Sequence, residues 1–242
     1  DNDLPYTDCS PGFGSVAKYI ATSTLEAGLD VKSMAETSTK VFILEVMGRH
    51  AGWIAAASCL AATKAGDPPH IILLPEVPFE KTKFITQVKQ TVKEQGYCVI
   101  VASEGTQAKN GKFLADSGLT DAFGHKQLGG VAPVLAGMIS KIGLKNHWAV
   151  ADYLQRSARH IASKTDLDQA YAVGEHAVKL AIAGKTAVMP IIKRTNDLPY
   201  RWKIATAPLK NVANIEKTMP KKFISKNGFE ITQAGKTYLR PL

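Results

Sequence analysis

The sequence lacks the features that identify several common classes of protein. It has no run of about 18 or more apolar residues, so it predicts no membrane-spanning helix. No basic stretch followed by an apolar one opens the chain, so no secretory signal is expected. The first residue is not Met, and Asp1-Asn2-Asp3 is typical of the interior of a protein. No Gly-Lys-Ser/Thr phosphate loop occurs, and the six histidines show no metal-ligand spacing.

Cysteine is also scarce. The odd count of three and the wide spacing of Cys9, Cys59 and Cys98 argue against a disulfide framework and against a zinc site. Cys59 and Cys98 lie among apolar residues, so we expect them to be small core residues. A reducing, cytoplasmic setting fits this usage.

Positively charged residues are in excess. Lys and Arg number 30 against 21 Asp and Glu, which gives a net charge of +9. This balance suits an anionic partner such as a phosphate compound, a nucleic acid or a membrane surface, and a merely well-solvated surface is the alternative. The 242 residues are 45% hydrophobic and 21% charged, so we predict a soluble globular protein of one large or two small domains.

Short apolar runs alternate with segments of helical length. The predicted strands cover Val41–Val46, 70–74, 97–102, 147–154 and 186–192. The predicted helices cover 52–65, 79–95, 130–142 and 166–183. This alternation predicts an α/β fold with a mainly parallel sheet covered by helices on both faces. The pattern weakens from Lys193 onward, so 198–242 is predicted to be a peripheral extension packed on the core.

Ligands of an open parallel sheet bind at the carboxyl ends of its strands. Three predicted strands lead there into polar or glycine-containing segments, and the start of the chain is similar to the end of a further strand. The four segments are Met47-Gly48-Arg49, Ser103-Glu104-Gly105, Gln155-Arg156-Ser157-Ala158-Arg159 and Asp1-Asn2-Asp3. We therefore predict a ligand site at this edge of the sheet.

Two of these segments suit the binding of a phosphorylated ligand. Gly48 at a strand-to-helix turn lets a ligand approach the backbone, and Arg49 adds a planar fork that suits phosphate. The alternative for this segment is a tight turn with a solvated arginine. Glu104 ends an otherwise apolar strand, which favours an acceptor for ligand hydroxyls or, equally, a solvated strand end.

The other two segments carry charges of opposite sign. Arg156 and Arg159 follow Tyr153 and could form a phosphate clamp or a surface ion-pair network. Asp1 and Asp3 flank an asparagine and could bind Mg²⁺ or accept a proton from a hydroxyl, although such triplets are also ordinary turns.

Taken in order, these segments resemble the phosphofructokinase family. Asp1-Asn2-Asp3-Leu4 is similar to the end of its Thr-Ile-Asp-Asn-Asp motif. Residues 45–53 carry its Met-Gly-Arg signature, Ser103-Glu104-Gly105 follows, and 153–160 begin with Tyr-Leu-Gln-Arg. The Arg-His-Ala-Gly-Trp and Gln-Arg-Ser-Ala-Arg-His runs look more like pyrophosphate-using members than ATP-using bacterial ones. The resemblance covers essentially the whole chain.

The resemblance implies phosphoryl transfer from pyrophosphate to the 1-hydroxyl of fructose 6-phosphate, which gives fructose 1,6-bisphosphate, with Mg²⁺ as cofactor. Asp1 matches the catalytic base that takes the hydroxyl proton. Asp3 matches the aspartate associated with the metal and the transferring phosphate. Arg49 would steady the charge of the transferred group.

The resemblance also implies the groups that bind the sugar phosphate. Met47 and Gly48 would present their backbone to it, and Glu104 would bind its hydroxyls. Tyr153 and Arg156 would hold the 6-phosphate.

A homo-oligomer, either a dimer or a tetramer, is implied as well. Lys40 stands where the family often has a basic residue that reaches the substrate of a neighbouring subunit. His147 stands near the second such position, where an arginine would be expected.

One part of the family pattern does not occur. The Gly-Gly-Asp motif that holds the phosphoryl donor lies upstream of the Asp-Asn-Asp motif in the family. The resemblance therefore implies two Rossmann-like domains, the first of them incomplete. Residues 13–154 would bind fructose 6-phosphate, 1–12 and 155–205 would be the remnant of the donor domain, and 206–242 would be a C-terminal extension packed on the core. We expect these 242 residues alone not to catalyse phosphoryl transfer.

Three alternatives stay open. The donor could be ATP, or the chain could be a non-catalytic sugar-phosphate-binding or regulatory subunit, against which the intact Asp1 and Asp3 argue. A nucleic-acid-binding module would depend on the net charge and on the basic run 217–226, which lacks interleaved aromatic residues. Neither a nucleic acid nor a membrane is expected as a partner.

Overall fold

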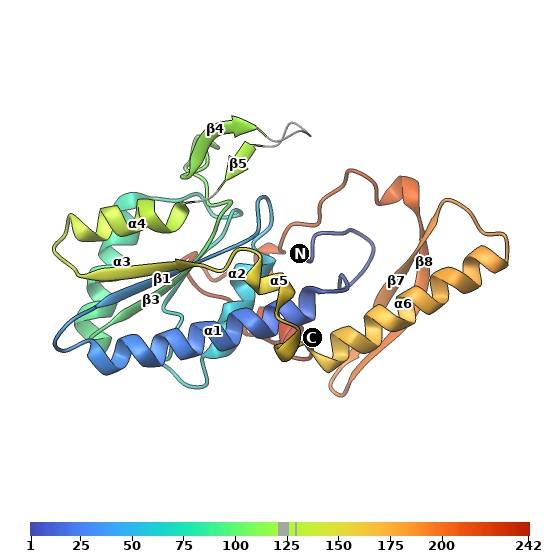
Figure 1. Cartoon of the computed structure of the whole chain (residues 1–242), viewed down its shortest axis with the longest axis horizontal. Coiled ribbons are helices and arrows are strands. Elements are labelled where there is room, and N and C mark those ends of the chain that lie inside the picture. Colours follow the sequence, from blue (N-terminus) through green and yellow to red (C-terminus); the bar gives the residue numbers. More distant parts are fainter. Residues whose placement is uncertain (121–125, 129) are drawn as a thin grey trace.

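The central sheet is built from the most apolar runs of the sequence. Figure 1 shows a computed structural model of the chain, which describes residues 1–120, 126–128 and 130–242. Four parallel strands pair in the order β2-β3-β1-β6. Their bounds are Ile71–Leu73 (β2), Cys98–Ser103 (β3), Val41–Val46 (β1) and Asn146–Val150 (β6). The central strands β1 and β3 are buried almost throughout, as a parallel sheet covered on both faces requires.

Alternate residues of each strand face opposite layers of helices, because successive side chains of a strand point to opposite sides. Leu44 and Val46 of β1 pack with α1 and α2, whereas Val41 and Ile43 pack with α3 and α4 (Figure 1). The bounds of these helices are Phe13–Met34 (α1), Trp53–Ala57 (α2), Lys81–Gln95 (α3) and Val131–Ser140 (α4). The predicted α/β fold with a mainly parallel sheet is confirmed.

A second group of elements lies beside the sheet. Helix α6 (Lys164–Ile182) packs on an antiparallel hairpin of β7 (Val188–Asp197) and β8 (Tyr200–Pro208), drawn in orange in Figure 1. Within α6, only Asp166 and Gln169 are buried. Four large apolar side chains of this helix are exposed, namely Leu167, Tyr171, Val178 and Ile182. A small antiparallel pair, β4 (Asp116–Thr120) and β5 (Lys126–Leu128), projects from the sheet.

The C-terminal segment, defined here as residues 212–242, returns to the sheet. It contains η4 (Lys221–Phe223) and α7 (Gln233–Leu239), and it follows η3 (Leu209–Asn211). Its apolar residues belong to the same buried cluster as Trp53, namely Met219, Phe223, Ile231, Leu239 and Leu242. The extension predicted for 198–242 does pack on the core, but its part from 212 onward is not peripheral, because it supplies residues of the main core. The proposed division into domains stays a prediction.

Several predicted elements differ from those observed. The helix predicted over 52–65 is replaced by α2 and a 3₁₀ turn, η1 (Ser58–Ala61). Beyond it, the Asp67 carboxylate accepts hydrogen bonds from the backbone N–H groups of Thr63 and Lys64, which competes with helical bonding. Helix α1 and strand β8 were not expected from the sequence. The three cysteines are buried free thiols, which confirms Cys59 and Cys98 as core residues.

Strand β1 has the predicted bounds, and the remaining predicted elements are present with shifted ends. The strand predicted over 147–154 ends at Val150, and a short helix, α5 (Leu154–Ser157), follows before the turn η2 (Arg159–Ile161). The strand predicted over 186–192 continues to Asp197. In the described ranges 1–120, 126–128 and 130–242, no helix has the length and apolar character needed to cross a membrane.

A buried carboxylate joins the sheet to α4. Glu45 of β1 is 1% exposed, and its two oxygens accept hydrogen bonds from the N–H groups of Gly130 (3.0 Å) and Ala132 (2.8 Å). These donors belong to the first turn of α4 and would otherwise lack partners, and a negative charge is favourable there. The sequence alone makes Glu45 look like an interruption in an apolar strand.

We predict that Glu45→Ala destabilises the fold by about 2–3 kcal/mol, because two N–H groups at the start of α4, one of them buried, lose their carboxylate acceptor. Urea denaturation measures the change in the free energy of unfolding. Glu36→Ala, which alters an exposed glutamate, is the control and should change it little. Equal effects of the two substitutions would contradict the capping role of Glu45.

Candidate active site

A cavity of about 600 Å³ lies at the carboxyl edge of the sheet. The ends of β1 and β3, the first residues of the chain and the start of α6 all contribute to its wall. Seven of the residues predicted from the sequence line it together: Asp1, Asp3, Met47, Gly48, Arg49, Glu104 and Arg156. The acidic start of the chain and arginines from two later segments therefore share one space.

The loop after β1 is held against the end of β3 by short backbone contacts. The Gly48 carbonyl accepts hydrogen bonds from the Gly105 N–H, at 3.1 Å, and from the Ser103 hydroxyl. Gly48 has a φ of 134°, a conformation that side-chain-bearing residues rarely adopt. A Cβ on Gly105 would overlap the Arg49 carbonyl. Glycine at both positions therefore lets the two loops approach closely enough to fix Arg49 at the cavity.

Glu104 belongs to the loop after β3, faces the loop after β1 and is half-buried. Its Oε1 accepts a hydrogen bond from the Gly48 N–H at 3.2 Å. Burial raises the pKa of the Glu104 carboxyl, with Glu45 and Asp152 adding to the rise, while the Gly48 N–H and the Arg49 charge oppose it. A partly desolvated carboxyl at a cavity wall is suited to accept hydrogen bonds from the hydroxyls of a ligand.

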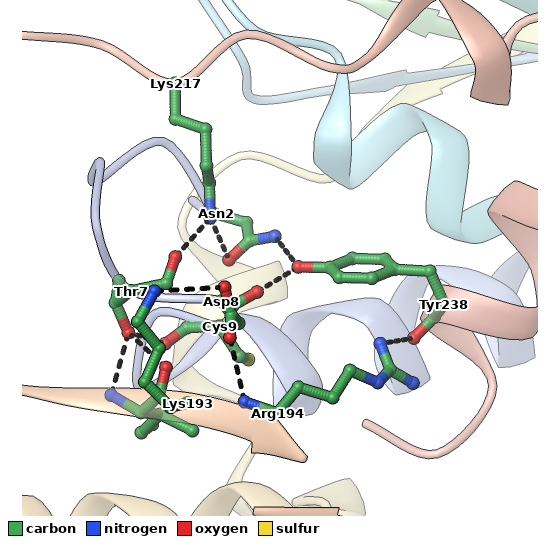
Figure 2. A network of polar contacts seen from close by, with 9 residues as sticks. Asn2, Thr7, Asp8, Cys9, Lys193, Arg194, Lys217 and Tyr238 are labelled. Atoms are coloured by element: carbon green, nitrogen blue, oxygen red, sulfur yellow. Dashed lines mark hydrogen bonds and ion pairs between the residues drawn. The ribbon is translucent and has the colours of Figure 1, made fainter. Parts of the chain in front are cut away.

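The side chains of the acidic segment, defined here as Asp1–Asp3, point alternately to the cavity and to the core. Asp1 is exposed, Asp3 is half-buried, and both line the cavity, whereas Asn2 between them is 0% exposed. Successive side chains of an extended chain point to opposite sides, which accounts for this division. The Asn2 N–H donates to Asp1 Oδ1 at 2.7 Å. The Asn2 side chain belongs to the network of polar contacts drawn in Figure 2.

Arg156 reaches the cavity from α5, but Tyr153 does not line it. Tyr153 is 62% exposed, and the Arg156 guanidinium lies over its ring at 4.3 Å from the ring centre. The ring therefore supports Arg156 by a cation–π contact. Arg159, predicted in the same cationic cluster, also lines the cavity. The buried Gln155 accepts a hydrogen bond from the Met47 N–H at 3.4 Å, which ties α5 to the loop after β1.

Lys40 lies at the other end of β1, directly before Val41. The strand advances about 3.3 Å per residue, so Lys40 is roughly 20 Å along the strand from Met47. Its ammonium donates to the Ala35 carbonyl. Lys40 is not part of this chain's cavity, and its contact with the substrate of a neighbouring subunit stays a prediction.

Asp166 is a cavity residue that the sequence analysis did not single out. It is buried in the first turn of α6, and its carboxylate accepts hydrogen bonds from the Gly12 N–H (2.7 Å) and the Ser15 N–H (3.1 Å) at the start of α1. The Ser163 hydroxyl in turn accepts from the Asp166 N–H. The Ser-x-x-Asp spacing of a helix start was a usable signal for this residue.

The carboxylates at the cavity fit a magnesium ion shared with a ligand. In the described part of the chain, no group of three or more His, Cys, Asp or Glu residues could hold a metal by itself. Mg²⁺ is usually bound through one or two carboxylates together with substrate phosphates and water. Asp1 and Asp3 can supply such carboxylates.

Comparison with known proteins agrees with this geometry. A family model described as "Phosphofructokinase" matches residues 1–181. The chain belongs to the phosphofructokinase family. The family resemblance inferred from the Asp-Asn-Asp and Met-Gly-Arg segments is thereby confirmed.

Individual phosphofructokinases show how far the similarity extends. Proteins named pyrophosphate--fructose 6-phosphate 1-phosphotransferase from Halomonas elongata and Methylococcus capsulatus are 65% and 59% identical over 243 residues. Each match covers 100% of this chain and 58% of the relative, so the chain spans little more than half their length. A crystal structure of a pyrophosphate-dependent phosphofructokinase from Marinobacter aquaeolei matches with a TM-score of 0.89 and 60% identity, over 99% of this chain and 57% of that one.

We predict that Glu104→Gln raises the melting temperature at pH 7 but not at pH 4. A carboxyl with a raised pKa binds more protons in the folded state, so its contribution to stability falls as the pH rises above about 4.5. Glutamine carries no charge to desolvate and still accepts the Gly48 N–H. Thermal denaturation at both pH values provides the measurement.

The matched control for this prediction is Glu26→Gln, which alters an exposed glutamate of α1 and should show no such pH dependence. A stabilisation by Glu104→Gln that is the same at pH 4 and pH 7 would mean that the buried charge is not its cause.

Proposed function

We propose that the chain carries the sugar-phosphate site of a pyrophosphate-dependent 6-phosphofructokinase, which transfers a phosphoryl group from pyrophosphate to the 1-hydroxyl of fructose 6-phosphate. The main support is that Asp1, Arg49, Glu104 and Arg156, from four separate parts of the sequence, line one cavity. The names of relatives that are 58–65% identical support the same reaction and the same donor.

The proposed mechanism needs little covalent chemistry from the protein. Asp1 accepts the proton of the 1-hydroxyl as that oxygen attacks the phosphoryl group, and Arg49 stabilises the charge on the transferring group. Glu104 accepts hydrogen bonds from sugar hydroxyls, Arg156 binds the 6-phosphate, and the Met47–Gly48 backbone borders the sugar. Fixed charge and orientation then supply most of the acceleration.

Magnesium fits this arrangement at Asp3, with Asp1 beside it. When bound, the ion would neutralise part of the charge of the pyrophosphate. The rest of the donor site would come from protein outside these 242 residues, because the chain spans 58% of its relatives' length.

A homo-oligomer is part of the proposal. Strand β6 is the open edge of the sheet, and Trp148 and Val150 on it are 47% and 41% exposed. Leu154 at the start of α5 is 66% exposed. This apolar edge next to the cavity suits contact with a second chain.

The donor is tested in a family-length enzyme that carries these residues. We expect turnover of fructose 6-phosphate with pyrophosphate and Mg²⁺, and little turnover with ATP, in a coupled assay of fructose 1,6-bisphosphate. Residues 1–242 alone should be inactive. A preference for ATP would show that the donor is ATP and not pyrophosphate. Binding of the sugar phosphate without turnover would favour the non-catalytic subunit.

Substitutions at the two sides of the cavity should separate binding from chemistry. Arg156→Ala should raise KM for fructose 6-phosphate about 10- to 100-fold, because a charge-assisted contact to phosphate is lost. Asp1→Asn should lower kcat about 10²- to 10⁴-fold with little change in KM, because it removes a general base. Steady-state kinetics measures both constants.

Arg201→Ala, which alters an exposed arginine on β8, is the matched control and should change neither constant. An unchanged KM in Arg156→Ala would remove Arg156 from the phosphate clamp.

A further inference from the structure

The C-terminal segment is bonded directly to the acidic segment that opens the chain. The Lys217 N–H donates to the Asp3 carbonyl at 2.6 Å. The Lys217 ammonium donates to the Thr7 carbonyl at 2.9 Å and lies 3.5 Å from Asn2 Oδ1 (Figure 2). The longer contact is at the limit of a hydrogen bond, so the ammonium acts on Asn2 mainly through its charge. Lys217 thus contacts the acidic segment through both its backbone and its side chain.

Lys217 is itself fixed in the core by Trp53. The indole N–H of Trp53 donates to the Lys217 carbonyl at 2.8 Å, and the ammonium lies 5.3 Å from the centre of the indole ring. Trp53 is 2% exposed and belongs to α2, directly after the loop that carries Arg49. The arginine loop and the acidic segment are therefore linked through one half-buried lysine.

The Asn2 amide has partners on both sides. Its Nδ2 donates to the Tyr238 hydroxyl at 2.7 Å, and its Oδ1 accepts from the Ser10 N–H at 2.9 Å. The Tyr238 hydroxyl donates to the Asp8 carbonyl. Because Asn2 is wholly buried between Asp1 and Asp3, its side chain fixes the point from which the two carboxylates enter the cavity.

We propose that Lys217 is a positioning residue for phosphoryl transfer, which holds Asp1 and Asp3 at the cavity through the buried Asn2 amide and the Asp3 backbone. This inference rests on the proposed function, since it assigns those carboxylates to the reacting groups. Lys217 does not line the cavity and acts through its neighbours.

The first test is Lys217→Met in the family-length enzyme, since methionine keeps the aliphatic packing and removes the ammonium. We expect kcat to fall about 10- to 100-fold and KM for fructose 6-phosphate to change less than about twofold, because misplaced carboxylates affect the reacting geometry and not the Arg156 clamp. Lys222→Met, which alters an exposed lysine of the same segment, is the matched control and should leave both constants unchanged.

The second test is rescue by a conservative substitution. Lys217→Arg keeps a positive charge and hydrogen-bond donors at this position, so its kcat should lie much closer to that of the unsubstituted enzyme than the kcat of Lys217→Met does.

Stability is measured in parallel by thermal denaturation, so that a loss of kcat can be separated from a loss of the fold. If Lys217→Met unfolds, the same two constants are measured for Lys217→Gln, which keeps an N–H donor for the Thr7 carbonyl but carries no charge.

An unchanged kcat in Lys217→Met, a parallel change in KM and kcat, or a kcat of Lys217→Arg as low as that of Lys217→Met would each overturn the positioning role. The proposed function is judged separately by turnover of the unsubstituted enzyme. Absence of that turnover would count against the phosphofructokinase activity itself.

Discussion

The parallel pairing of β1 with β3 positions the two loops that carry Arg49 and Glu104 to the cavity. Val46 pairs with Ser103 in register, so the two strands end at the same level of the sheet. The loops that follow can then exchange the hydrogen bonds of Gly48 with Ser103, Glu104 and Gly105. A shift of one residue between the strands would turn their side chains to the opposite faces and separate these loops. The cavity therefore depends on the same contacts that build the core.

The cavity also joins parts of the chain that are far apart in sequence. Asn2 bonds to Tyr238 across 236 residues, and Gly12 bonds to Asp166 across 154 residues. Each link has one buried polar partner, Asn2 or Asp166, whose hydrogen bonds are directional and costly to leave unmade. Apolar packing holds these segments together, and the polar links fix which atoms face the cavity.

The sequence was sufficient for features that depend on local pattern. Strand β1 was predicted with its observed bounds, and the strand ends led to Arg49, Glu104 and Arg156 as cavity residues. Strand β8 was missed although its residues alternate, with Arg201 and Lys203 exposed between half-buried neighbours. The Ser-x-x-Asp spacing indicates that Asp166 lies at a helix start, but not that it lies at the cavity. The contacts that give Asp166 and Lys217 their places at the site are with residues more than 150 positions away, so the sequence did not show them. Tyr153 was predicted to bind phosphate, but its observed contact is with the Arg156 guanidinium.

The double role of Asp166 has a mechanical consequence. Its carboxylate caps the start of α1, which covers the sheet, while its backbone belongs to the first turn of α6, which carries the β7–β8 hairpin. The starts of the two helices must move together, so any swing of the hairpin unit relative to the sheet would pivot close to this aspartate. Because Asp166 is also part of the cavity wall, such a hinge would lie at the cavity itself, and the far end of α6 would travel the greater distance.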